Sequence, residues 1–138
     1  MNNLQIELDQ DRVAFEPGEE LRGSVCWKSS QPLRSVELRL FWFTRGKGTE
    51  DAGVVETVHF DQPSAEETCP FHFQLPEGPY SFSGKLISLV WALELIAQPS
   101  GEPLRVEFVM APGTREVRLE SLPEPELKKA FMEWSSRG

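Results

Sequence analysis

Hydrophobic and polar residues alternate over most of residues 4–110, in short segments separated by many of the chain's 11 prolines and 10 glycines. A period of two is typical of β-strands that bury one face. The clearest case is residues 21–28, where Leu21, Gly23, Val25 and Trp27 share one face. We predict further strands over residues 4–8, 12–15, 35–44, 54–60, 71–75 and 104–110.

One apolar run, Leu86 to Ile96, does not alternate, and its length suits either a buried helix or a central strand. We predict a strand, because its neighbours are predicted strands and a lone helix would interrupt their packing. Seven or eight short strands separated by turns predict an all-β fold, an antiparallel two-sheet β-sandwich.

Beyond residue 120 the pattern becomes helical. Ser121 and Glu124 have the spacing of a capping box, and apolar residues follow at helical intervals: Leu127, Ala130, Phe131 and Trp134. We therefore predict a β-sandwich domain over residues 1–120 and a short C-terminal amphipathic α-helix with a tail over residues 121–138. The helix either docks on its own sheet or presents Phe131 and Trp134 to a partner's groove. The sequence leaves both possibilities open.

Length and charge narrow the classes of function. The 138 residues fit one domain, and 39% hydrophobic residues supply a core that needs no disulfide or metal. With a net charge of −8, the chain lacks the clustered basic footprint that nucleic acid or anionic lipid requires. The sequence shows no signal peptide and no transmembrane run, which predicts a cytoplasmic protein.

Candidate chemical groups are few and scattered. His59, His72, Cys26, Cys69 and Met110 could serve as copper ligands, but copper-binding sandwiches gather such ligands in one loop, and these are spread along the chain. Strand parity places the two cysteines on opposite faces, which predicts free thiols rather than a disulfide. The sequence has no Gly-x-Ser-x-Gly elbow and no paired catalytic carboxylates, so we predict no enzyme and no cofactor.

Four motifs, in order, resemble those of the arrestin family. Phe15 followed by Pro17-Gly18-Glu19 and then Gly23 resembles the arrestin-type opening, and residues 71–76 resemble its strand that ends in Leu-Pro. Residues 79–85 resemble the Pro-x-Ser-Phe-x-Gly loop, and the long apolar strand follows at Leu86. The resemblance covers roughly residues 4–110 and implies an arrestin-like, immunoglobulin-like sandwich. Because only one sandwich is present, the chain is most similar to small prokaryotic arrestin-like proteins, including the sporulation-control family.

The resemblance implies a non-catalytic adaptor or scaffold that binds another protein. Strand parity puts Phe41 and Phe43 on the outward face of their strand, where an exposed pair would form a binding patch. An exposed sheet edge is the second candidate surface, either for a partner's strand or for self-pairing into a homo-oligomer. The alternative is a carbohydrate-binding sandwich whose platform would combine four aromatic residues, namely Phe41, Phe43, Tyr80 and Trp91.

Overall fold

The computed structural model describes residues 3–46, 51–84, 86–99, 102–114 and 117–118, and these form two β-sheets. The smaller sheet is antiparallel and has the order β1-β3-β6, with β1 at Asn3–Leu8, β3 at Glu20–Lys28 and β6 at Glu66–Gln74. Buried residues recur at every second position along β3, because a strand alternates its side chains between two faces.

The larger sheet has the order β10-β7-β8-β4-β5, with β9 beside β8 and β2 beside β9. Its bounds are β2 Ala14–Phe15, β4 Ser35–Gly46, β5 Ala52–Phe60, β7 Phe82–Ser83, β8 Ile87–Gln98, β9 Leu104–Met110 and β10 Val117–Arg118. The short pairs β10–β7 and β2–β9 are parallel, and the other pairs of this sheet are antiparallel. Two 3₁₀ turns follow β1 and β9, at Asp9–Asp11 and Pro112–Thr114.

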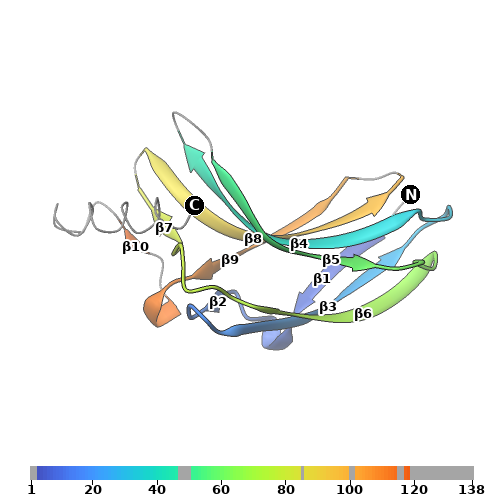
Figure 1. Ribbon diagram of the computed structural model, residues 1–138, viewed down its shortest axis with the longest axis horizontal. Helices are drawn as coiled ribbons and strands as arrows, with labels where there is room; N and C mark the ends of the chain where they lie inside the picture. The colour runs from blue at the N-terminus through green and yellow to red at the C-terminus, as the bar shows by residue number, and fades with distance from the viewer. Residues whose placement is uncertain (1–2, 47–50, 85, 100–101, 115–116, 119–138) are drawn as a thin grey trace.

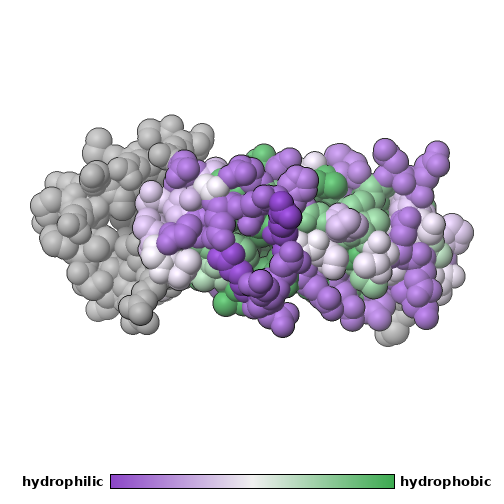
Figure 2. All heavy atoms as spheres, turned by 90° about the horizontal axis from the view of Figure 1, so that it is seen from below, coloured by the Kyte–Doolittle hydropathy of each residue, from purple (hydrophilic) through white to green (hydrophobic). Residues whose placement is uncertain are grey.

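The two sheets lie on top of one another (Figure 1). In that view the central strands β4 and β8 rise toward both ends, so the face of this sheet that points away from the smaller sheet is concave. The smaller sheet lies below, and its outer face is mainly hydrophilic across the middle (Figure 2). The polar side chains on that face alternate with buried ones along β3, as at Arg22 and Ser24.

The core lies between the sheets and contains most of the predicted inward residues. Its largest fully buried side chains are Trp27, Trp91, Phe73, Leu21, Leu38, Leu40, Leu75, Leu89, Leu93, Leu95, Met110 and Val25. Both fully buried tryptophans donate their indole N–H to a backbone carbonyl, Trp27 to Ser64 at 2.9 Å and Trp91 to Pro79 at 2.7 Å. The predicted all-β sandwich is therefore confirmed, and the ambiguous apolar run is the strand β8.

Some predicted boundaries were wrong. The strand predicted over residues 71–75 begins at Glu66, because β6 pairs with the whole of β3 and its first half carries polar residues that give no hydrophobic pattern. The strand predicted over residues 12–15 is only Ala14–Phe15. The predicted C-terminal helix over residues 121–138, with Phe131 and Trp134, lies outside the described residues.

Candidate binding surface

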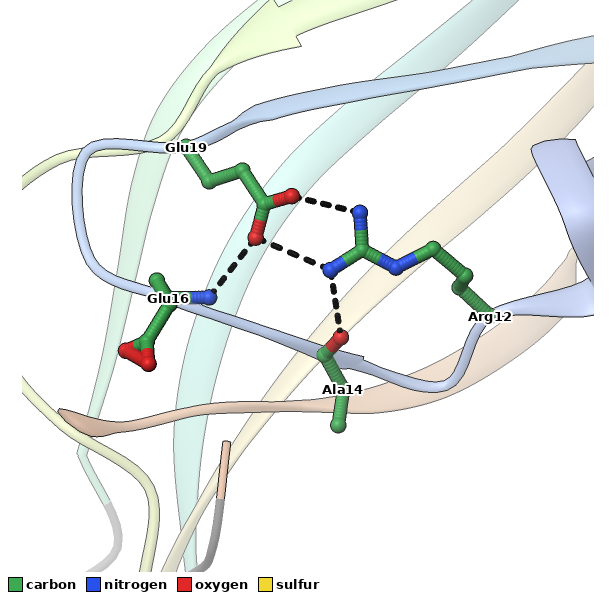
Figure 3. Close-up of polar contacts among 4 residues, drawn as sticks. All are labelled: Arg12, Ala14, Glu16 and Glu19. Atoms are coloured by element: carbon green, nitrogen blue, oxygen red, sulfur yellow. Dashed lines mark hydrogen bonds and ion pairs between the residues drawn. The ribbon is translucent and has the colours of Figure 1, made fainter. Parts of the chain in front are cut away.

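The Pro-Gly-Glu motif closes a turn and locks it with an ion pair. Gly18 has a φ of +79°, which glycine adopts without strain. Glu19 accepts two hydrogen bonds from the Arg12 guanidinium, at 2.5 and 2.9 Å, and a third from the Glu16 backbone N–H at 2.9 Å (Figure 3). Arg12 also donates to the Ala14 carbonyl at 3.0 Å. The Glu19 carboxylate therefore fixes the chain before and after the turn.

This ion pair shifts the protonation equilibria of both partners. Hydrogen bonds from Arg12 and then from the Glu16 backbone lower the pKa of Glu19, because they favour the ionised carboxylate. The hydrogen bond to Glu19 raises the pKa of Arg12. Both side chains are partly exposed, so water weakens the pair. Its role is to position the turn rather than to perform chemistry.

The loop over residues 79–82 also serves the fold. Ser81 is buried; its backbone N–H donates to the Met110 carbonyl at 2.8 Å, and its Oγ accepts the Met110 N–H at 3.0 Å. Phe82, the phenylalanine of this loop, is buried in the core. Other chain segments approach Gly23 closely, because a Cβ there would press against the Glu7 carbonyl and lie 2.9 Å from Phe71 Cζ.

Phe41 and Phe43, the outer aromatic pair, lie on the concave outer face of the larger sheet, midway along β4. Their rings stack with centroids 5.8 Å apart. The Arg105 guanidinium covers both rings, 5.1 Å from the centroid of Phe41 and 4.8 Å from that of Phe43. Arg45 lies 5.3 Å from the Phe43 ring. Phe41 is therefore only 8% exposed although it lies outside the main core, and the pair is a covered patch rather than an open one.

Carboxylates hold these two arginines in place. Glu94 on β8 accepts from Arg105 at 3.2 Å, and Glu107 on β9 accepts from Arg45 at 2.5 Å. A guanidinium over an aromatic face contributes about 0.5–1 kcal/mol at an exposed site. The two ion pairs therefore place positive charge over the rings and shield one side of the aromatic pair from solvent.

The four-residue aromatic platform of the alternative, carbohydrate-binding hypothesis does not form. Trp91 pairs with Trp42 on the core side of the larger sheet and is fully buried, whereas Phe41 and Phe43 lie on the opposite side. A strand sends successive side chains to opposite faces, so odd positions of β4 and odd positions of β8 point apart in this register. Tyr80 lies in the loop before β7. No flat row of the four rings forms for a sugar.

The free edge of β5 carries a feature that the sequence analysis missed. β5 is the last strand in its sheet, and among the described residues no strand pairs with its side away from β4. Val54 is 61% exposed and Val55 is 42% exposed. The ladder with β4 shifts register between Leu40 and Phe41, which leaves Val55 as the extra residue of a β-bulge.

The bulge explains why these valines face outward. It reverses the parity of β5, so Val58 and Phe60 pack against the core while Val54 lies beside Phe41 on the outer face. Two consecutive β-branched residues break the alternation of a half-buried strand, since both cannot face the core. That break was the available signal in the sequence.

The groups considered as metal ligands are dispersed. His59 on β5 and His72 on β6 are both exposed. The Nδ1 atom of His59 lies 3.7 Å from a carboxylate oxygen of Glu37. Cys26 and Cys69 are free thiols with different cross-strand neighbours, as predicted, and burial followed by the charge of Glu67 raises the pKa of Cys69. Over the described ranges, no group of three or more His, Cys, Asp or Glu side chains is arranged to hold a metal ion.

No helix in the described part of the chain is long and apolar enough to cross a membrane. No family model matches the sequence. Over 102 residues the chain is 31% identical to the protein named arrestin domain-containing protein 1 from Rattus norvegicus and 30% identical to its counterpart from Homo sapiens. The alignments cover 63% of this chain and 24% of each relative. The chain thus spans about a quarter of the length of these curated relatives.

Among solved structures, the chain is similar to Spo0M, a sporulation control protein from Bacillus subtilis, with a TM-score of 0.57 and 22% identity. The match covers 80% of this chain and 49% of that one, and at this identity it shows the fold alone. The two-sheet topology and these similarities agree: the chain has an arrestin-like β-sandwich fold.

Proposed function

We propose that this chain is a non-catalytic protein-binding module that captures an extended segment of a partner along the free edge of β5. The observation that carries the proposal is the adjacent pair Val54 and Val55, both exposed, on an unpaired strand of the larger sheet. Exposed edges pair readily with other strands, and natural proteins usually protect them with lysine, proline or charge. β5 has a bulge and one acidic residue, Glu56, but no lysine or proline.

Strand addition suits the chemistry of this edge. An added strand gains affinity from backbone hydrogen bonds and specificity from its alternating side chains. On the concave face, the neighbours of such side chains are Val54 and the outer aromatic pair, Phe41 and Phe43. Phe131 and Trp134, predicted as partner anchors from the sequence, remain a separate hypothesis for the C-terminal residues.

The edge of β6 is less suited to this role. β6 contains Pro70, which has no backbone N–H, and begins with two glutamates, Glu66 and Glu67. The motif residues described above use their polar groups within the fold, which supports a binding role for the chain rather than catalysis. The relatives named above carry arrestin domains, and an adaptor role by analogy agrees with the proposal.

A peptide-display selection tests the proposal. Random twelve-residue peptides are selected on the wild-type chain and then compared on a variant carrying Val54→Thr and Val55→Thr, which keeps β-branched residues and removes apolar surface. The matched control is Val13→Thr, because Val13 is 67% exposed but lies outside β5. We expect selected peptides to lose at least tenfold in affinity on the double variant and to keep it on the control.

Protection of β5 amides from hydrogen exchange by the selected peptide would locate the added strand. Analytical ultracentrifugation of the chain without peptide measures its oligomeric state and tests whether a second copy of the chain occupies the edge instead. A wild-type dimer that becomes monomeric in the double variant would mean that β5 pairs with itself. Peptides that bind both variants equally would reject the β5 edge as the binding site.

A further inference from the structure

The region that contains β5 and β6 is uniformly acidic. From Asp51 to Gly84 the sequence contains no lysine or arginine, although the whole chain has 14 of them. The same stretch contains six acidic residues: Asp51, Glu56, Asp61, Glu66, Glu67 and Glu77. In the described part of the chain, β5 is an edge strand of the larger sheet and β6 is an edge strand of the smaller sheet. The acidic stretch therefore includes two free edges.

Glu56 is the acidic residue within β5 itself. It is exposed, and its cross-strand neighbour on β4 is Leu40. Among the ion pairs of the described residues, none involves Glu56. By contrast, Glu66 on β6 lies opposite Lys28, which supplies a positive charge within the ladder.

The charged groups on the outer face near β5 largely cancel. Arg39 lies opposite Thr57 and is bound to Glu37 at 2.8 Å, and His59 lies 3.7 Å from the same carboxylate. Asp51 and Asp61, both exposed, flank the two ends of β5. A strand added to this edge would therefore meet negative charge at Glu56, which has no ion pair among the described residues, and at Asp51 and Asp61.

Side-chain direction separates the charge from the apolar surface. In the register with β4, Val54 lies beside Phe41 on the outer face, whereas Glu56 shares the side of Leu40. An added strand sends alternate side chains to these two sides. Apolar side chains on one side would contact Val54, and basic side chains on the other would approach Glu56.

We propose, on the basis of the function proposed above, that the segment captured by β5 is a basic strand in which lysine or arginine alternates with branched apolar residues. Opposite charges across an interface increase the association rate and select among partners. The net charge of −8 extends this attraction to longer range and makes it sensitive to salt.

Two labelled ten-residue peptides test the partner's chemistry, one alternating lysine with valine and the other alternating glutamate with valine. Binding is measured by fluorescence anisotropy at pH 7.4 in 150 mM NaCl. We expect the lysine peptide to bind at least tenfold more tightly than the glutamate peptide, and hydrogen exchange to slow in β5. Equal binding of the two peptides would overturn the proposal.

Charge variants separate local recognition from general attraction. Glu56→Lys is expected to weaken binding of the lysine peptide about threefold to tenfold, and Glu56→Gln about half as much on a logarithmic scale. The control is Glu66→Lys, which makes the same change in net charge on the edge of β6 and is expected to have less than a twofold effect. Equal effects of Glu56→Lys and Glu66→Lys would overturn the local site.

The two proposals fail in different ways. If the display selection yields β5-dependent peptides without basic residues, the edge binds proteins but the basic specificity is wrong. If no selected peptide depends on Val54 and Val55, the function proposed for the edge is itself rejected. Circular dichroism of Glu56→Lys and Glu56→Gln confirms that any loss of binding occurs in a folded chain.

Discussion

Two regions of this sandwich use their polar and aromatic side chains for different purposes. At the end of the sandwich that carries the motif loops, the Glu19 side chain accepts a hydrogen bond from the backbone of its own turn, and those of Ser81 and Trp91 bond to the backbone of other segments. On the concave face, Phe41 and Phe43 lie outside the main core, and the arginines above them are bound to neighbouring strands. The groups of the first region are used within the fold, whereas the second region has exposed apolar surface at Val54, beside the covered aromatic pair.

The comparison explains why motifs in the sequence and binding surfaces do not coincide. The Pro-Gly-Glu and Pro-x-Ser-Phe-x-Gly motifs need particular residue types because turns and buried polar groups tolerate few substitutes. A strand edge imposes no such requirement, since most of its hydrogen-bonding capacity is in the backbone. A binding edge can therefore lie in a segment with no recognisable motif, such as β5.

The largest effect is expected from Trp91→Ala in the first region. Trp91 is fully buried, contacts Phe108 with ring centroids 6.2 Å apart and donates to the Pro79 carbonyl. Removing it leaves a cavity and a carbonyl without its donor, which costs about 3–5 kcal/mol of unfolding free energy. The control on the other face is Phe43→Ala, where the half-buried ring is expected to cost about 1–2 kcal/mol. Urea denaturation of both variants measures the difference. Similar losses in the two variants would mean that the outer aromatic pair belongs to the core.

Much of the first region could be predicted from the sequence. The alternation over Leu21, Gly23, Val25 and Trp27 predicted the buried face of β3. The run from Leu86 was predicted as a strand from its neighbours alone. Local patterns sufficed because each of these features depends on residues close together in the sequence or on strand parity.

The second region could be predicted only in part. Parity placed Phe41 and Phe43 on the outward face, but their cover comes from Arg105, which is distant in sequence and reaches them through the pairing of β8 with β9. The bulge at Val55 inverts the parity of half of β5, and strand order makes β5 an edge. These properties depend on which strands pair and in what register, and the hydrophobic pattern does not specify either.

A smaller, pH-dependent effect is expected from Glu19→Gln, again in the first region. The pKa of Glu19 is lowered in the folded chain from the ordinary value of a glutamate, chiefly by the hydrogen bonds from Arg12, so the ionised carboxylate stabilises the fold. This contribution is fully present above the unfolded pKa and is lost as the pH falls through the folded pKa. Because the pair is partly exposed, we expect a loss of about 1 kcal/mol in the variant at pH 7.

Denaturation of wild type and Glu19→Gln at pH 7 and at pH 3 measures this change. The difference between the two proteins is expected to shrink at the lower pH, which lies below the unfolded pKa of a glutamate, because protonation of the unfolded chain then offsets the stabilisation from the ionised carboxylate. Glu102→Gln, at an exposed loop position, is the control and should match wild type at both values. A difference that stays constant with pH would show that Glu19 acts through packing rather than through its charge.

The smallest effect on stability is expected from Arg105→Ala, in the second region. The substitution removes the guanidinium from the rings of Phe41 and Phe43 and breaks the ion pair with Glu94, at a cost of about 0.5–1 kcal/mol because the site is partly exposed. It also uncovers apolar surface on the concave face. We therefore expect increased binding of an apolar fluorescent dye with little change in the denaturation midpoint. Arg34→Ala, at an exposed position before β4, is the control and should change neither measurement. A large loss of stability without dye binding would mean that Arg105 supports the fold, and the difference between the two regions would then disappear.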